Sequence, residues 1–117
     1  GRVLREYQLV YITKGRGLFS SDSTPERQVC KGRLMVLFPG QWHTYYPLRQ
    51  TGWTEYYIGF EGPAIDTIVG DAFLSQERQI LEVGIMKNWY LCFPALWKWQ
   101  KQIKYLPSNP FPESYFT

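Results

Sequence analysis

The chain has 117 residues, of which 44% are hydrophobic and 18% aromatic, and it carries a net charge of +3. This length fits one domain with a single core, and the hydrophobic fraction argues against disorder. The mild positive charge is scattered, which favours a solvated surface over a nucleic-acid-binding face. The same holds for a looser group of lysines near the end, at Lys87, Lys98, Lys101 and Lys104.

The two cysteines, Cys30 and Cys92, stand outside any metal-binding or disulfide pattern. No secretory leader opens the sequence, and no apolar run approaches the thickness of a bilayer. We therefore expect a cytoplasmic protein that makes no membrane contact.

The first third of the chain predicts a long strand and a hairpin. Residues 6–14 are β-branched and aromatic, which is typical of a strand. Gly15-Arg16-Gly17 permits a sharp bend or bulge, and residues 18–20 continue the strand. Residues 21–25 have the composition of a hairpin loop, so residues 26–30 should return antiparallel.

Three further strands are predicted up to residue 60. Residues 34–38 form a continuous apolar run between Gly32 and Pro39-Gly40, as expected for a strand buried on both faces. Residues 43–46 and 53–60 are the other two. Short strands with turn signals at roughly 8–12-residue spacing indicate a sandwich or closed barrel.

The pattern changes after Phe60. Pro63 suits the first turn of a helix, and apolar residues follow at helical spacing over 64–69. Residues 75–83 are predicted to form a second short helix. We therefore expect a mainly-β unit over 1–60, and then a helical segment over 61–85 that packs on it or dimerises.

Three motifs occur in one order. Tyr7 to Gly17 is a strand with a glycine bend, and Gly32 to His43 is a buried strand, a Pro-Gly turn and a histidine. Trp53 to Gly62 is an aromatic strand that ends in Phe-x-Gly. The second motif resembles a conserved motif of cupin barrels. Together, over residues 6–85, the three are similar to the arabinose-binding-like sensor domains of AraC-type transcription regulators.

The resemblance implies a fold and a role. The fold would be mainly β, a cupin-like barrel (double-stranded β-helix or jelly roll) followed by one or two α-helices. The barrel would bind a small-molecule effector, often a sugar, and the helices would form a homodimer. In this family a separate helix-turn-helix half binds DNA. Nothing in 86–117 has that pattern, so no direct DNA binding by this chain is expected.

The resemblance places four side chains on the inner wall of the barrel: Lys14, Tyr45, Glu55 and Tyr57. Trp53 shares the face of Glu55 and Tyr57 because side chains alternate along a strand. An aromatic wall with a few polar groups suits a sugar. The alternative is that Trp53 and Tyr57 only fill the barrel and Lys14 is solvated.

His43 is the only histidine, and it either bonds the effector or holds the Pro39-Gly40 turn. It completes the set of candidate ligand-binding residues. A cupin metal site needs several histidines and a carboxylate, so we expect no metal, no cofactor and no catalytic residues. The alternatives are a small cupin enzyme, such as a sugar isomerase or dioxygenase, and a truncated remnant that does not sense.

Residues 86–117 hold three of the five tryptophans and four of the eight prolines. Tryptophan has the single codon TGG, which a leucine codon followed by a G-starting codon yields in a shifted frame. A Leu/Val/Ala/Glu-rich helix read out of frame would therefore become rich in tryptophan, as at Trp89, Trp97 and Trp99. We predict that this tail is frameshifted. The alternative is a natural aromatic tail that packs on the barrel.

Overall fold

A computed structural model of the chain describes residues 1–60, 78–84 and 99–105. These ranges contain strands, turns and loops, and no helix. All strand pairs are antiparallel. The strands are β1 (Arg2–Val3), β2 (Tyr7–Ser21), β3 (Arg27–Cys30), β4 (Arg33–Leu37), β5 (Trp42–Pro47), β6 (Trp53–Phe60), β7 (Ile80–Glu82) and β8 (Gln100–Lys104).

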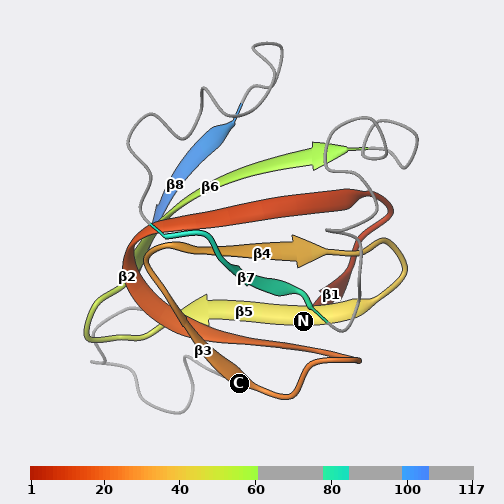
Figure 1. The fold of residues 1–117 in the computed structure, drawn as a ribbon, viewed down its shortest axis with the longest axis horizontal. Helices are drawn as coiled ribbons and strands as arrows, with labels where there is room; N and C mark the ends of the chain where they lie inside the picture. Colours follow the sequence, from red (N-terminus) through yellow and green to blue (C-terminus); the bar gives the residue numbers. More distant parts are fainter. Residues whose placement is uncertain (61–77, 85–98, 106–117) are drawn as a thin grey trace, which may run out of the picture.

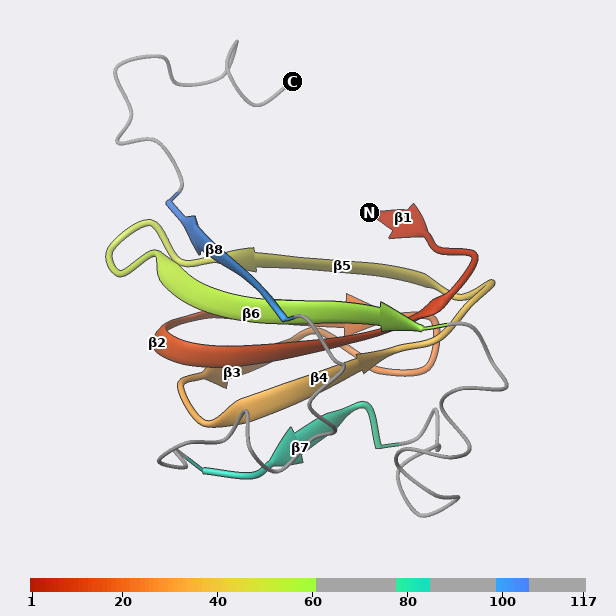
Figure 2. The ribbon, with the colours of Figure 1, turned by 90° about the horizontal axis from the view of Figure 1, so that it is seen from above.

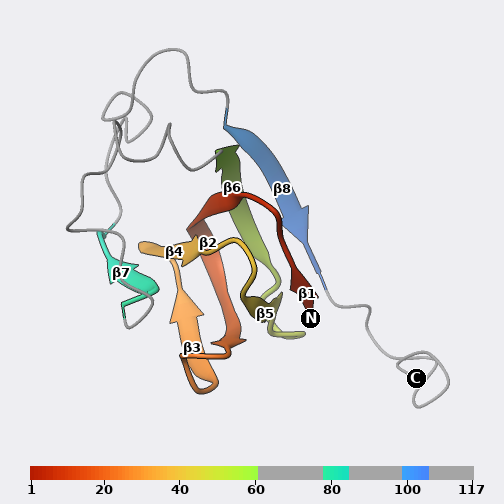
Figure 3. The ribbon, with the colours of Figure 1, turned by 90° about the vertical axis from the view of Figure 1, so that its right-hand side faces the viewer.

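The long strand β2 is shared by two sheets (Figure 1). Its first half pairs with β4 and β6, and its second half pairs with β3 and β5. β7 adds to β4, β8 adds to β6, and β1 adds to β5. Seen from above, β5 and β6 lie on one side of β2, and β4 and β7 lie on the other (Figure 2). The side view places β1 and β8 on the side of the molecule opposite β7 (Figure 3).

The transfer of β2 from one sheet to the other takes place at the predicted glycine bend. The register with β6 shifts between Ile12 and Lys14, which marks a β-bulge at Thr13. Gly15 has a φ of +84°, in the left-handed region that favours glycine. A Cβ atom at Gly17 would overlap the backbone of the neighbouring strand and the ring of Trp53. Both glycines are therefore required by the geometry of the bend.

Strand β4 is buried on both faces, as the apolar run predicts. Leu34 and Val36 pack with Leu9 and Tyr11 in one cluster. Met35 and Leu37 pack in a second cluster on the opposite face, together with Val10, Ile12, Phe19, Val29 and Trp53. Tyr45 and Tyr57, which line the site described below, pack against this second cluster.

The prediction of a short helix over 75–83 is wrong for the residues that the structure describes. Residues 80–82 form β7, which pairs with Arg33, Leu34 and Met35 of β4. The edge of β4 offers unpaired backbone groups, and pairing with them outweighs a weak helical pattern. The predicted helix over 64–69, and the dimerisation assigned to that segment, lie outside the described residues.

Gln79 fixes the start of β7. It is 1% exposed, and its side-chain nitrogen donates to the Val36 carbonyl and to Gln41 Oε1. Its side-chain oxygen accepts from the hydroxyls of Ser21, Ser23 and Thr24 in the loop after β2. A buried amide is thereby satisfied on both sides, and β7 is tied to the β2–β3 hairpin.

The tail also contributes to the sheet. Residues 100–104 form β8, which pairs with residues 53–57 of β6. The described part of the tail therefore packs on the strands of the N-terminal half. This packing does not distinguish a natural tail from a frameshifted one, because any sequence with sufficient β-propensity can extend an open sheet edge. The frameshift therefore stays a prediction.

Candidate functional site

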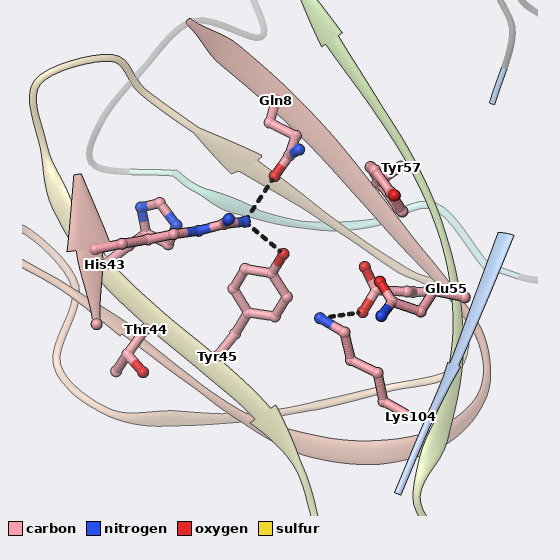
Figure 4. Close-up of a pocket in the computed structure, with 10 residues that line it drawn as sticks. Gln8, His43, Thr44, Tyr45, Glu55, Tyr57 and Lys104 are labelled. Carbon is pink, nitrogen blue, oxygen red and sulfur yellow. Dashed lines mark hydrogen bonds and ion pairs between the residues drawn. The ribbon is translucent and has the colours of Figure 1, made fainter. Parts of the chain in front are cut away.

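The structure contains a cavity of about 420 Å³, within the range of about 300–1,000 Å³ usual for small-molecule sites (Figure 4). Strands β1, β2, β5, β6 and β8 supply its walls. The lining residues are Gly1, Arg2, Gln8, His43, Thr44, Tyr45, Glu55, Tyr57, Gln102 and Lys104.

An aromatic stack forms one wall of the cavity. His43 and Tyr45 follow each other on one face of β5, with ring centroids 5.9 Å apart and planes inclined by 17°. Tyr45 stacks in turn on Trp53 of β6, at 5.9 Å and 23°. Trp53 is 1% exposed and does not line the cavity. By stacking on Tyr45, the buried Trp53 fixes the position of the Tyr45 ring in the absence of a ligand.

Glu55 is a buried carboxylate with two partners. It is 1% exposed, and its Oε1 accepts a hydrogen bond from Trp53 Nε1 at 3.0 Å. The ammonium group of Lys104 lies 2.9 Å from the same oxygen (Figure 4). Lys104 Nζ also lies 4.8 Å from the centroid of the Tyr45 ring, a cation–π distance. The negative charge of Glu55 is therefore already compensated.

Arg2 also lines the cavity and has weaker contacts than Lys104. Its guanidinium donates to Gln8 Oε1 at 3.4 Å and to the Tyr45 hydroxyl at 3.3 Å (Figure 4). Both distances exceed the usual 2.7–3.2 Å for such bonds, and both acceptors are neutral. Among the described residues, Arg2 forms no salt bridge.

His43 is the least satisfied polar group of the site. The residue is 1% exposed, and neither ring nitrogen has a hydrogen-bond partner within the described residues. Burial lowers the pKa of His43 from its ordinary value of 6.5. The nearby backbone of Gln41 acts in the opposite direction and raises the pKa of His43, although it is not placed to form a hydrogen bond with the ring. At neutral pH the ring is uncharged and offers one donor and one acceptor.

The hydroxyl of Tyr45 stays protonated over the whole physiological range. Burial, and after it the charge of Glu55, raises the pKa of Tyr45 to about 12. The cavity therefore presents a phenol at this position and not a phenolate.

The structure brings together four of the six residues predicted to bind ligand: His43, Tyr45, Glu55 and Tyr57 all line the cavity. Trp53 lies behind them, as described above.

Lys14, expected on the inner wall, is exposed and lies outside the cavity. Before the bulge Gln8, Val10 and Ile12 face the inside, and simple alternation would add Lys14. The register shift at Thr13 reverses this alternation, so that Phe19 points inward after it.

Sequence reasoning missed five lining side chains: Arg2, Gln8, Thr44, Gln102 and Lys104. Gln8 could have been found from its alternation with Val10 and Ile12. The sequence predicts that Lys104 belongs to a solvated surface group, whereas the structure shows it as the ionic partner of Glu55. No local signal reveals this, because the pairing of β8 with β6 joins distant parts of the chain.

The described residues contain no group of three or more His, Cys, Asp or Glu side chains that could hold a metal ion. Within the same ranges, no helix is long and apolar enough to cross a membrane.

Comparison with known protein families gives a match over residues 2–110 to the model of the AraC-like ligand binding domain. No DNA-binding domain is found within the 117 residues. Comparison with the curated proteins and with the solved structures gives no significant match.

Proposed function

The chain belongs to the family of AraC-like ligand binding domains, and from this we propose that its cavity binds a small, hydroxyl-rich effector. The bound molecule would act as the signal of a transcription regulator. In this proposal the chain regulates and does not catalyse, and it acts as a homodimer.

The observation that carries the proposal is the lack of hydrogen-bond partners, among the described residues, for both ring nitrogens of the buried His43. A buried imidazole with two unpartnered nitrogens costs free energy unless something bonds to it. Because the neutral ring offers one donor and one acceptor, its complement is a group with both functions, such as a hydroxyl. The side chains of Gln8, Tyr57 and Gln102 add further donors and acceptors around the same space.

Thermal unfolding in the presence of sugars, sugar acids, amino sugars and small organic acids tests the proposal. A ligand that binds only the native state raises the melting temperature. The matched variants are Gln102→Ala, whose side chain lines the cavity, and Lys101→Gln, its neighbour on the other face of β8.

We expect at least one compound to stabilise the protein, with a reduced shift in Gln102→Ala and an unchanged shift in Lys101→Gln. The proposal fails if no compound stabilises the wild type. It fails equally if the ligand raises the melting temperature of Gln102→Ala, and of a second cavity variant, Tyr57→Phe, by as much as it raises that of the wild type. Light scattering of the wild type tests the homodimer separately.

A further inference from the structure

We infer that the cavity selects a molecule that carries one carboxylate beside its hydroxyls, such as a sugar acid, over a neutral sugar. This inference rests on the proposed function and concerns the charge of the ligand.

The first argument is the charge balance of the lining side chains. They include two cations, Arg2 and Lys104, and one carboxylate, Glu55. The ion pair of Lys104 with Glu55, at 2.9 Å, uses one charge of each sign. His43 is neutral, since burial lowers its pKa. The positive charge of Arg2 is left over, which favours a negatively charged ligand.

The second argument is the bonding of Arg2. Its present partners, Gln8 Oε1 and the Tyr45 hydroxyl, are neutral and lie at 3.4 and 3.3 Å. A guanidinium presents a planar fork of donors that matches the two oxygens of a carboxylate, and such charge-assisted pairs are shorter and about twice as strong as neutral ones. A carboxylate would therefore replace two weak bonds by two strong ones.

The third argument is the position of His43 relative to Arg2. The two residues are directly paired across β1 and β5, and both side chains reach the cavity. A ligand whose carboxylate meets Arg2 would extend along the wall that carries His43. Its hydroxyls would then meet the unpartnered imidazole nitrogens. The two groups together select a hydroxy acid over a simple fatty acid or inorganic anion.

A cationic ligand fits less well. Among the described residues that line the cavity, Glu55 is the only carboxylate, and Lys104 and Trp53 already bond to it. An amino sugar would have to displace Lys104 from this buried pair and would face the uncompensated charge of Arg2.

Titration calorimetry with two matched series tests the inference: glucose, glucosamine and glucuronate, and galactose, galactosamine and galacturonate. Within each series only the charge differs greatly. We expect the acid of at least one series to bind about tenfold or more tightly than the neutral sugar, with the amine weakest. The preference should shrink as salt is added, because the mouth of the cavity is open to solvent.

Arg2→Gln is the critical variant, and Arg5→Gln is its control, because Arg5 is exposed and does not line the cavity. We expect Arg2→Gln to lose the tenfold preference and Arg5→Gln to keep it.

Three results would overturn the inference. In the first, a neutral sugar binds as tightly as its acid, which leaves the proposed function intact. In the second, the acid is preferred equally with and without Arg2. In the third, neither series binds and the wider thermal screen finds only uncharged or cationic effectors. If that screen finds no effector at all, the proposed function falls as well.

Discussion

The ammonium group of Lys104 lies 2.9 Å from the Glu55 carboxylate and joins the last described strand to the wall of the cavity. Glu55 is 1% exposed and Lys104 is 29% exposed, so the lysine closes off a charge that would otherwise be isolated. The pair couples the packing of β8 to the electrostatics of the site.

Replacement of Lys104 by methionine should destabilise the protein. Breaking a fully buried pair costs about 3–5 kcal/mol, and here the partial exposure of Lys104 lowers our expectation to about 2 kcal/mol. Urea unfolding measures the change. Lys101→Met is the control, since Lys101 is exposed and lies over Tyr56 outside the cavity. If the pair matters, Glu55→Gln should restore most of the loss in the Lys104→Met background. Equal stability of the two lysine variants would contradict the prediction.

His43 should titrate below its ordinary pKa of 6.5, because burial disfavours the charged ring. It is the only histidine, so NMR gives a single imidazole signal to follow. The unfolded state binds the proton first as pH falls. Stability from this group is therefore complete above about pH 6.5 and is lost as pH falls through the folded pKa. A midpoint at or above 6.5 would contradict the burial described here. Arg2→Gln should raise the midpoint slightly, since the charge of Arg2 also lowers this pKa.

Gly17→Ala should destabilise the bend in β2. The added Cβ would overlap the backbone of β5 and the ring of Trp53, and overpacking of this kind costs about 1–3 kcal/mol. Gly40→Ala is a useful comparison. A Cβ atom at Gly40 would meet no atom of the described residues within 4 Å beyond its chain neighbours, so the substitution adds only the strain of a φ of +76°, for which about 1–2 kcal/mol is expected. Thermal and urea unfolding should show that Gly17→Ala is less stable than Gly40→Ala. The reverse order would show that β5 shifts to accommodate the added Cβ at little cost in free energy.

The strands up to residue 60 could be predicted because their signals are local. The apolar run 34–38 corresponds to strand β4 (Arg33–Leu37), and the predicted turns correspond to the positive φ angles of Gly32 and Gly40. The shared face of Trp53, Glu55 and Tyr57 follows from alternation alone. The family resemblance, together with this alternation, led to four residues that line the cavity in the structure, His43, Tyr45, Glu55 and Tyr57, while their role in binding stays a prediction.

The rest depends on non-local pairing. One extra residue at Thr13 moves Lys14 out of the cavity, and nothing in the sequence identifies which residue bulges. β7 and β8 exist because β4 and β6 have open edges to pair with. Lys104 reaches Glu55 only through such pairing, so its composition-based assignment to a solvated surface was wrong.

The tail gives the last prediction. If it is natural, β8 was selected to complete the cavity through Gln102 and Lys104, and its removal should be costly. If it is frameshifted, its residues were never selected to pack, and the protein should lose little without them, a result that would also argue against the cost predicted for Lys104→Met. The test is a chain that ends after residue 98, compared with one that ends after residue 105 and retains β8. For a natural tail, the shorter chain should melt lower and expose the buried Glu55, while the longer chain should match the full chain. Equal melting of all three would favour the frameshift, which sequencing of the gene then decides. A helix-turn-helix coding sequence in the alternative frame downstream would establish the frameshift, and its absence would refute the prediction.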